Sequence, residues 1–141
     1  MIAYFDTSAL LKLVITEDGA DQAGLLWEEA SEVVVSRLVW PEALAALAAA
    51  RRGRRLTEAD HAAAIRLFRD LFGRCTVVSV ADHIVERAAE LAAGYDLRAA
   101  DAIHLATALA VVESDSIMVT WDKRLQQAAI QAGLVTAPAG S

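Results

Sequence analysis

Short runs of β-branched and aromatic residues alternate with longer segments of helical pattern along nearly the whole sequence. The predicted strands lie at residues 2–5, 33–36, 76–80 and 116–120, with a fifth at 133–136. The predicted helices between them cover residues 8–15, 21–30, 41–52, 57–72, 81–93, 99–112 and 122–132. Strands that are separated by helices form a parallel sheet with helices on both faces, so the sequence predicts the α/β class.

Residues that begin and end helices support these boundaries. Pro41 suits the first turn of a helix, where its missing N–H removes no hydrogen bond. Thr57 followed by Asp60 resembles a capping box in which aspartate replaces glutamate. Gly94 and Gly133 are predicted to end their helices, because glycine readily adopts the left-handed conformation that follows a last turn.

Length and composition indicate a single soluble domain. The 141 residues, of which 56% are hydrophobic, suffice to bury one core, which we expect over residues 1–137 with a flexible tail over 138–141. The single cysteine, Cys75, excludes an intrachain disulfide and is typical of a reducing compartment. The sequence shows no signal-peptide pattern and no apolar stretch of roughly 18 residues that could span a membrane. It therefore predicts a cytoplasmic protein.

Four acidic residues occupy positions where the predicted fold makes a carboxylate informative. Asp6 directly follows the first predicted strand, and Asp122 follows the strand at 116–120 after one tryptophan. Because the carboxyl ends of parallel strands meet at one edge of the sheet, both side chains should project there. Glu42 and Asp101 interrupt apolar helical segments, where a carboxylate is costly to bury unless it is paired, hydrogen-bonded or bound to metal. We refer to Asp6, Glu42, Asp101 and Asp122 as the acidic quartet.

Each of these acids also has a purely structural interpretation. Asp6 and Asp122 could cap the helices that follow them, whereas Glu42 and Asp101 lie in first turns, where the helix dipole favours negative charge. Four such coincidences are better explained by a shared site. Converging carboxylates raise one another's pKa, and a hard divalent cation such as Mg²⁺ or Mn²⁺ relieves their repulsion. Because such an ion can activate water against a phosphodiester, the residues point to a metal-dependent nuclease.

Four sequence blocks resemble, in order and spacing, the signature of the PIN-domain ribonucleases. They are YFDTSALLKL, VWPEALAAL, LRAADAIHLATAL and MVTWDKRL. The first and third blocks are the most specific, and the resemblance extends from residue 2 to about residue 135. The branch that the chain resembles is that of the VapC toxins of bacterial toxin–antitoxin pairs. This resemblance implies a PIN-like fold with a parallel four- to five-stranded sheet flanked by helices on both faces.

The resemblance also implies roles for particular residues. The acidic quartet matches the family's catalytic, metal-binding carboxylates, and Ser8 and Thr120 match hydroxyl residues that support the first and last of them. The implied protein is a Mg²⁺- or Mn²⁺-dependent endoribonuclease that forms a homodimer and binds a small antitoxin. Family members often carry a further acid where this sequence has Lys123 and Arg124, so the choice between one ion and two stays open.

Basic residues near these blocks are candidates for RNA binding. The net charge of -6 does not indicate a nucleic-acid-binding protein in bulk, but a local basic surface can coexist with an acidic whole. Lys12 and Arg98 each lie near a block of the site. A basic cluster at the end of the third predicted helix consists of Arg51, Arg52, Arg54 and Arg55. The alternative for this cluster is a solvated helix end whose charges compensate the helix dipole.

Three ring side chains adjoin the same blocks. His104 lies three residues after Asp101 and shares its helical face. Because sites of this kind bind metal through oxygen, His104 is predicted to be a hydrogen-bonded residue of the helix face rather than a ligand. Trp40 and Trp121 could stack on an unpaired base, but core packing is the preferred interpretation for both.

Two other functions remain open for the same residues. A PIN-like module could bind RNA or a protein partner without cleaving RNA, although four mutually repelling acids favour catalysis. An aspartyl-phosphate phosphohydrolase resembling the haloacid dehalogenases would need a second aspartate two residues after Asp6. This sequence has Ser8 at that position, which makes the phosphohydrolase the weaker alternative.

Overall fold

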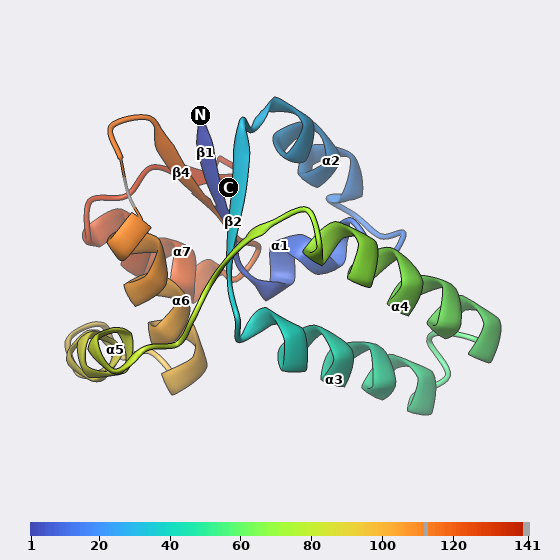
Figure 1. Ribbon diagram of the computed structural model, residues 1–141. Helices are drawn as coiled ribbons and strands as arrows, with labels where there is room; N and C mark the ends of the chain where they lie inside the picture. The colour runs from blue at the N-terminus through green and yellow to red at the C-terminus, as the bar shows by residue number, and fades with distance from the viewer. Residues whose placement is uncertain (112, 140–141) are drawn as a thin grey trace.

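The structure, a computed structural model, describes residues 1–111 and 113–139 and is organised around one parallel sheet (Figure 1). Its strands are β1 (Ile2–Phe5), β2 (Glu32–Ser36), β3 (Thr76–Val78), β4 (Ser116–Val119) and β5 (Thr136–Ala137), in the spatial order β3-β2-β1-β4-β5. The helices are α1 (Thr7–Lys12), α2 (Ala20–Glu29), α3 (Val39–Arg52), α4 (Glu58–Phe72), α5 (Asp82–Tyr95), α6 (Ala99–Val111) and α7 (Lys123–Gln131). The predicted α/β fold with a parallel sheet is therefore confirmed.

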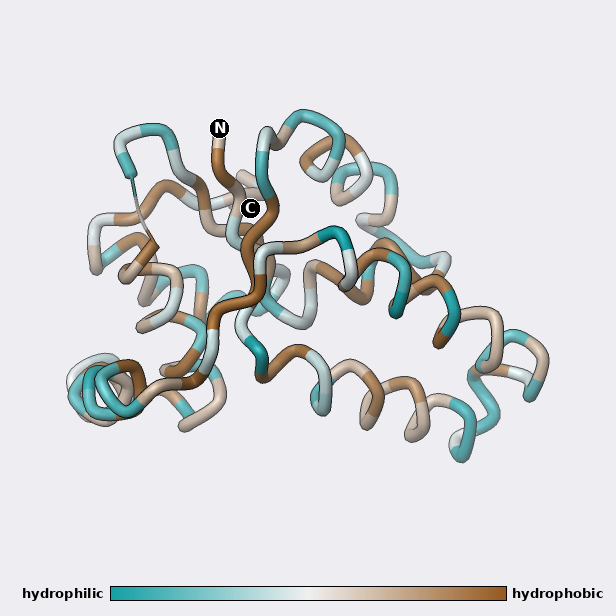
Figure 2. The backbone as a smooth tube through the Cα atoms, in the orientation of Figure 1, coloured by the Kyte–Doolittle hydropathy of each residue, from teal (hydrophilic) through white to brown (hydrophobic). Residues whose placement is uncertain are grey.

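The sheet separates two apolar layers, and the alternation of side chains along β1 shows how. Ala3 and Phe5 pack into a core with helices α1 to α4, whereas Tyr4 points to the opposite face and packs with α5, α6 and α7. Figure 1 shows these two sets of helices on opposite sides of the strands, and Figure 2 shows the hydrophobic strands between them. Because both faces are covered, the strands read as nearly continuous apolar runs.

Helices α3 and α4 form a hairpin that extends away from the sheet (Figure 1). Its base is anchored by an aromatic cluster in which the ring centroid of Trp40 lies 5.5 Å from that of Phe68 and 5.2 Å from that of Phe72. The guanidinium carbons of Arg37 and Arg69 lie 5.8 and 5.9 Å from the centroid of Trp40. Trp40 is thus a packing residue, as the sequence predicted.

Some predicted boundaries were wrong, and each error has a local cause. Gly94 does not end its helix, because α5 continues to Tyr95 and Asp96 adopts the left-handed conformation instead, with φ of 53°. Gly133, with φ of 97°, does follow the last turn of α7. Leu134 still donates its N–H to the carbonyl of Ala129, so the last strand begins at Thr136 rather than at 133.

Other boundaries were close to their predictions. The strand predicted at 76–80 ends at Val78, and Thr57 caps α4 by accepting the N–H of Asp60 at 3.0 Å. The predicted end of a helix at residue 112 and the last two residues of the predicted tail lie outside the described residues. Pro138, the first residue of that tail, is tethered, because its carbonyl accepts a hydrogen bond from Nε2 of Gln126 at 2.7 Å. Among the helices described, none combines the length and apolar character needed to cross a membrane.

The loop between α1 and α2 passes close to Trp121 only because residue 19 is glycine. Gly19 has φ of +94°, and a Cβ added there would lie 2.7 Å from Nε1 of Trp121. We expect Gly19→Ala to lower the free energy of unfolding by about 1–3 kcal/mol, because it adds both backbone strain and a steric clash. Gly24→Ala is the matched control, since a Cβ there meets nothing within 4 Å and should stabilise α2 by roughly 0.5–1 kcal/mol. Urea denaturation of both variants measures the difference, and equal stabilities would contradict this account.

Candidate active site at the carboxyl edge of the sheet

The topology brings Asp6 and Asp122 to the same edge of the sheet. β1 and β4 are neighbouring parallel strands whose last residues, Phe5 and Val119, are paired in register. Asp6 follows β1 directly, and its N–H donates to the carbonyl of Val119 at 3.2 Å. Asp122 follows β4 after two residues and begins α7. The neighbouring strands β1 and β4 therefore place Asp6 beside the turn that contains Asp122, as their parallel arrangement requires.

Asp6 is almost completely buried and is bound by three donors. It is 4% exposed, and its Oδ1 accepts hydrogen bonds from Oγ of Ser8 at 2.7 Å and from the N–H of Ala9 at 2.9 Å. Its Oδ2 accepts a hydrogen bond from Oγ1 of Thr120 at 2.6 Å. Burial raises the pKa of the Asp6 carboxyl above its ordinary value, although the charge of His104 and these hydrogen bonds lower it in part. Ionising Asp6 at this position is therefore less favourable than ionising an aspartate in water.

Ser8 and Thr120 connect Asp6 to the turn between β4 and α7. Oγ of Ser8 accepts the N–H of Trp121 at 2.9 Å, and Oγ1 of Thr120 accepts the N–H of Asp122 at 3.0 Å. Each hydroxyl donates to Asp6 and accepts from the turn, so both fix the relative positions of the two carboxylates.

Glu42 enters the site from the first turn of α3 and is held by two side chains. Its Oε1 accepts a hydrogen bond from Oγ1 of Thr7 at 2.6 Å and lies 2.7 Å from Nε2 of His104. Burial alone would raise the pKa of the Glu42 carboxyl, but the hydrogen bonds from His104 and Thr7 and the charge of His104 lower it below its ordinary value. Glu42 is therefore ionised and fixed in place.

Asp101 and Asp122 face each other across the guanidinium of Arg98. Nε of Arg98 lies 3.4 Å from Oδ2 of Asp101, and its Nη2 lies 3.9 Å from Oδ2 of Asp122. Burial and the charge of Asp122 raise the pKa of the Asp101 carboxyl, whereas Arg98 lowers it. Because Arg98 is largely exposed, its charge offsets only part of the repulsion between the carboxylates of Asp101 and Asp122.

The donor chemistry of the acidic quartet suits a hard divalent cation. Burial raises the pKa of Asp6 and of Asp101, and the charge of Asp122 adds to the rise at Asp101, so ionising these acids is costly without a cation. Among the residues that the structure describes, no three aspartate, glutamate, histidine or cysteine side chains form a ready-made set of metal ligands. Mg²⁺ commonly binds through only one or two carboxylates and keeps several waters, so an open carboxylate edge fits such an ion without a closed cage.

Two members of the quartet also cap helices, so the structural interpretation of these residues does not exclude the functional one. Asp6 caps α1 through the N–H of Ala9, and Asp122 caps α7 by accepting the N–H of Leu125 at 3.1 Å. Capping uses Oδ1 in both residues. Each Oδ2 lies outside the capping bond, where that of Asp6 accepts from Thr120 and that of Asp122 lies 3.9 Å from Nη2 of Arg98.

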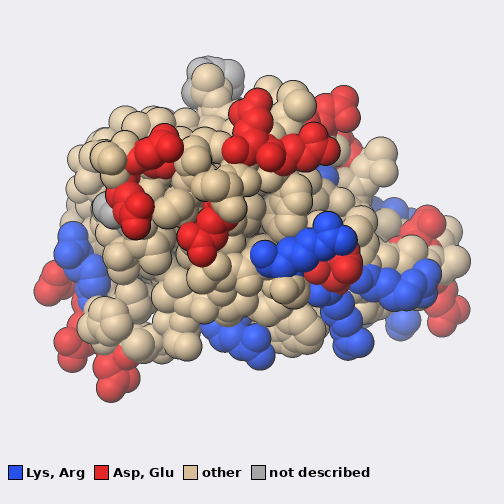
Figure 3. Space-filling model, turned by 45° about the horizontal axis from the view of Figure 1, so that its top comes forward, with Lys and Arg blue, Asp and Glu red and all other residues tan. Residues whose placement is uncertain are grey.

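The predicted basic residues are divided between two places. Arg51, Arg52, Arg54 and Arg55 are exposed around the end of α3. Figure 3 shows basic side chains over the α3–α4 end of the molecule, with acidic side chains among them. Lys12 is mostly covered, because its Nζ pairs with Glu17 at 3.2 Å and lies 5.8 Å from the ring centroid of Trp121. Trp121 itself packs partly against the core.

Sequence reasoning missed two residues that contact the site. Thr7 donates a hydrogen bond to Glu42, and the hydroxyl oxygen of Tyr4 lies 2.8 Å from Nδ1 of His104. The DTS segment placed Thr7 beside Asp6, which was the available signal for Thr7. Tyr4 gave no signal, because an aromatic residue in a strand is usually a packing residue.

Comparisons with known proteins show what the sequence and the fold are similar to. The sequence pattern of the PIN domain matches residues 3–131. Ribonuclease VapC45 of Mycobacterium tuberculosis (strain CDC 1551 / Oshkosh) is 42% identical over 138 residues, which cover 98% of this chain and 96% of that protein. M. tuberculosis VapC20, a sarcin-ricin loop cleaving toxin, superposes with a TM-score of 0.69 at 22% identity, covering 94% of this chain and 96% of VapC20. A toxin–antitoxin complex from Klebsiella pneumoniae gives a TM-score of 0.59 at 25% identity, covering 84% of each chain.

Proposed function

The chain belongs to the PIN-domain family, and from this membership we propose that it is a Mg²⁺- or Mn²⁺-dependent endoribonuclease that acts as the toxin of a toxin–antitoxin pair. The observation that carries the proposal is the gathering of four acidic residues around the carboxyl ends of β1 and β4, where burial and the charge of Asp122 raise the pKa of Asp101. Full-length similarity to ribonucleases of the VapC type supports the reaction class.

In this proposal the acidic quartet binds the cation, and the chain's other residues hold the quartet. When bound, the ion supplies a water of lowered pKa and neutralises charge that develops on the phosphodiester. Asp6 is the central ligand, because it is buried and fixed by Ser8 and Thr120. The position after Asp122 is basic in this chain, and Lys123 and Arg124 are exposed, so the number of ions stays open.

Binding of RNA is assigned to basic surfaces beside the acidic edge. The exposed arginines at the end of α3 are the first candidates, because Arg54 and Arg55 lie in a tight turn that presents them to solvent. Such contacts attract the phosphate backbone without reading its sequence. Lys12 is the weaker candidate, since Glu17 and Trp121 already engage it.

The proposed protein partner is a small antitoxin. Similarity to a K. pneumoniae toxin–antitoxin complex supports this partner, and the structure of VapBC-1 from Haemophilus influenzae, with a TM-score of 0.62, shares the fold. A homodimer stays a prediction. Such a partner would have to be removed before the activity of the isolated chain is measured.

Purified protein freed of any antitoxin should cleave RNA when Mg²⁺ or Mn²⁺ is present and stop when a chelator is added. The rate with excess chelator should fall by at least roughly 100-fold, because metal-activated water and charge neutralisation each contribute several kcal/mol to the reaction. Gel analysis of a structured RNA measures the rate, and addition of excess Mg²⁺ should restore it. Cleavage that persists in chelator would contradict the metal assignment, whereas RNA binding without cleavage would favour the silent PIN-like module.

A further inference from the structure

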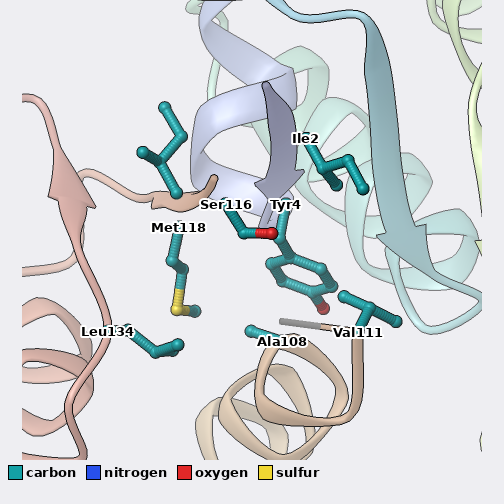
Figure 4. Close-up of a pocket in the computed structure, with 8 residues that line it drawn as sticks. Ile2, Tyr4, Ala108, Val111, Ser116, Met118 and Leu134 are labelled. Atoms are coloured by element: carbon teal, nitrogen blue, oxygen red, sulfur yellow. The ribbon is translucent and has the colours of Figure 1, made fainter. Parts of the chain in front are cut away.

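A group of four buried or partly buried polar residues, which includes Glu42, joins four different elements. Tyr4 comes from β1, Thr7 from α1, Glu42 from α3 and His104 from α6. His104 is 2% exposed and contacts all three others, with Nδ1 2.8 Å from the Tyr4 hydroxyl, Nε2 2.7 Å from Oε1 of Glu42 and 3.3 Å from Oγ1 of Thr7. Figure 4 shows Tyr4 extending from β1 toward Ala108 of α6, the helix that carries His104.

The direction of the hydrogen bond between His104 and Glu42 follows from the chemistry of the carboxylate. An ionised carboxylate only accepts hydrogen bonds, so Nε2 of His104 carries a hydrogen and donates a hydrogen bond to Oε1 of Glu42. Burial, together with the charge of Asp6, raises the pKa of the Tyr4 phenol well above its ordinary value, so its hydroxyl stays protonated. Tyr4 and Glu42 thus engage the two ring nitrogens of His104, and Nε2 donates to Glu42.

Packing alone does not account for a histidine at this position. The surrounding residues of α6 are alanine, leucine and isoleucine, and an apolar side chain could fill the same space without burying polar atoms. His104 and Thr7 both bind Oε1 of Glu42, and no donor to Oε2 occurs in the described part of the chain. His104 also follows Asp101 by three residues on α6, and its Nε2 lies 3.3 Å from Oγ1 of Thr7, the residue after Asp6.

We propose that His104 is a positioning residue that, with Tyr4 behind it and Thr7 beside it, fixes the Glu42 carboxylate through Oε1 and keeps Oε2 available to the divalent cation or its water ligands. The inference rests on the proposed function, because it assigns a role toward the cation that this function requires. Outer residues that orient a ligand typically change metal affinity by roughly 10–100-fold when they are replaced.

The test measures Mn²⁺ binding directly, by titration calorimetry and by electron paramagnetic resonance of the free ion, in the full chain freed of antitoxin. We expect His104→Leu to raise the Mn²⁺ dissociation constant by roughly 10–100-fold. His104→Gln should recover most of the affinity, because its amide N–H can reach the position of Nε2 and donate to Glu42. His83→Gln, which replaces an exposed histidine on α5, should bind as the parent does.

A comparison of two amides keeps the test valid where His104→Leu fails to fold. His104→Asn places its polar group near Nδ1 rather than Nε2, so it can reach Tyr4 but not Glu42. We therefore expect His104→Asn to bind Mn²⁺ more weakly than His104→Gln, with the same order in the Mg²⁺ concentration that half-saturates cleavage. Parent affinity in His104→Leu, or equal affinities in the two amide variants, would overturn this role of His104 alone. A parent chain that binds no Mn²⁺ would overturn the proposed function together with it.

Discussion

Replacing Asp6 or Asp101 with asparagine is expected to reduce RNA cleavage by a factor of at least roughly 10²–10³, because each change removes a charged ligand from the proposed cation site. Asp6 should have the larger effect, since it is 4% exposed and three donors already fix its carboxylate. Single-turnover cleavage of a structured RNA at saturating Mg²⁺ measures the loss. Glu86→Gln, at an exposed acid on α5, is the control and should cleave as the parent does.

Stability distinguishes lost catalysis from lost folding in the Asp6 variant. The pKa of Asp6 is raised in the folded chain, so the unfolded chain ionises first as pH rises. The free energy of unfolding of the parent therefore falls as pH rises from the pKa of Asp6 in the unfolded chain, about 3.9, to its raised pKa in the folded chain. It stays at the lower value at higher pH. Asparagine carries no charge, so in chelator at neutral pH Asp6→Asn should melt at the same temperature as the parent or a few degrees higher.

The difference in melting temperature should disappear at pH values below about 3.9, where aspartate is protonated in both states. If Asp6→Asn is inactive and melts at a much lower temperature than the parent at neutral pH, misfolding explains the lost activity. Wild-type rates in Asp6→Asn and Asp101→Asn would show that the acidic quartet is not the catalytic site.

Phe68→Ala is expected to lower the free energy of unfolding by about 3–5 kcal/mol, the largest loss of stability that we predict for a single substitution. Phe68 is fully buried, and its ring lies 5.5 Å from that of Trp40 and 5.7 Å from that of Phe72. These three rings join α4 to the start of α3, the helix that carries Glu42 into the site. A loss of this size is a large part of the 5–15 kcal/mol that stabilises a typical domain.

Urea denaturation followed by far-UV circular dichroism measures this loss. Leu67→Ala provides the matched control one residue away, because Leu67 is 41% exposed and its truncation should change stability by no more than roughly 0.5 kcal/mol. Where Phe68→Ala remains folded at low temperature, it should also weaken cleavage, since α3 positions Glu42. Equal effects of the two substitutions would contradict the anchoring role of the aromatic cluster.

Local sequence patterns were sufficient to predict the elements and their order. The apolar runs of β1, β2 and β4 are buried on both faces, which is why their β-branched composition identified them. Helix ends were less predictable, because Asp96 rather than Gly94 adopts the left-handed conformation after α5. A glycine allows that conformation but does not impose it, and here the N–H of Leu97 donates to the carbonyl of Ala92 after the left-handed Asp96.

The meeting of Asp6 and Asp122 at one edge could be predicted without the structure, because the position of an acid after a parallel strand follows from chain order and strand direction. The side chains that hold the quartet became known from the packing of the helices on the sheet. His104 meets Glu42 across 62 positions and Tyr4 across 100, and Arg98 lies between Asp101 and Asp122. These contacts depend on how α3 and α6 pack against β1. Distances between side chains on separate helices are set by that packing, and no local periodicity in the sequence encodes them.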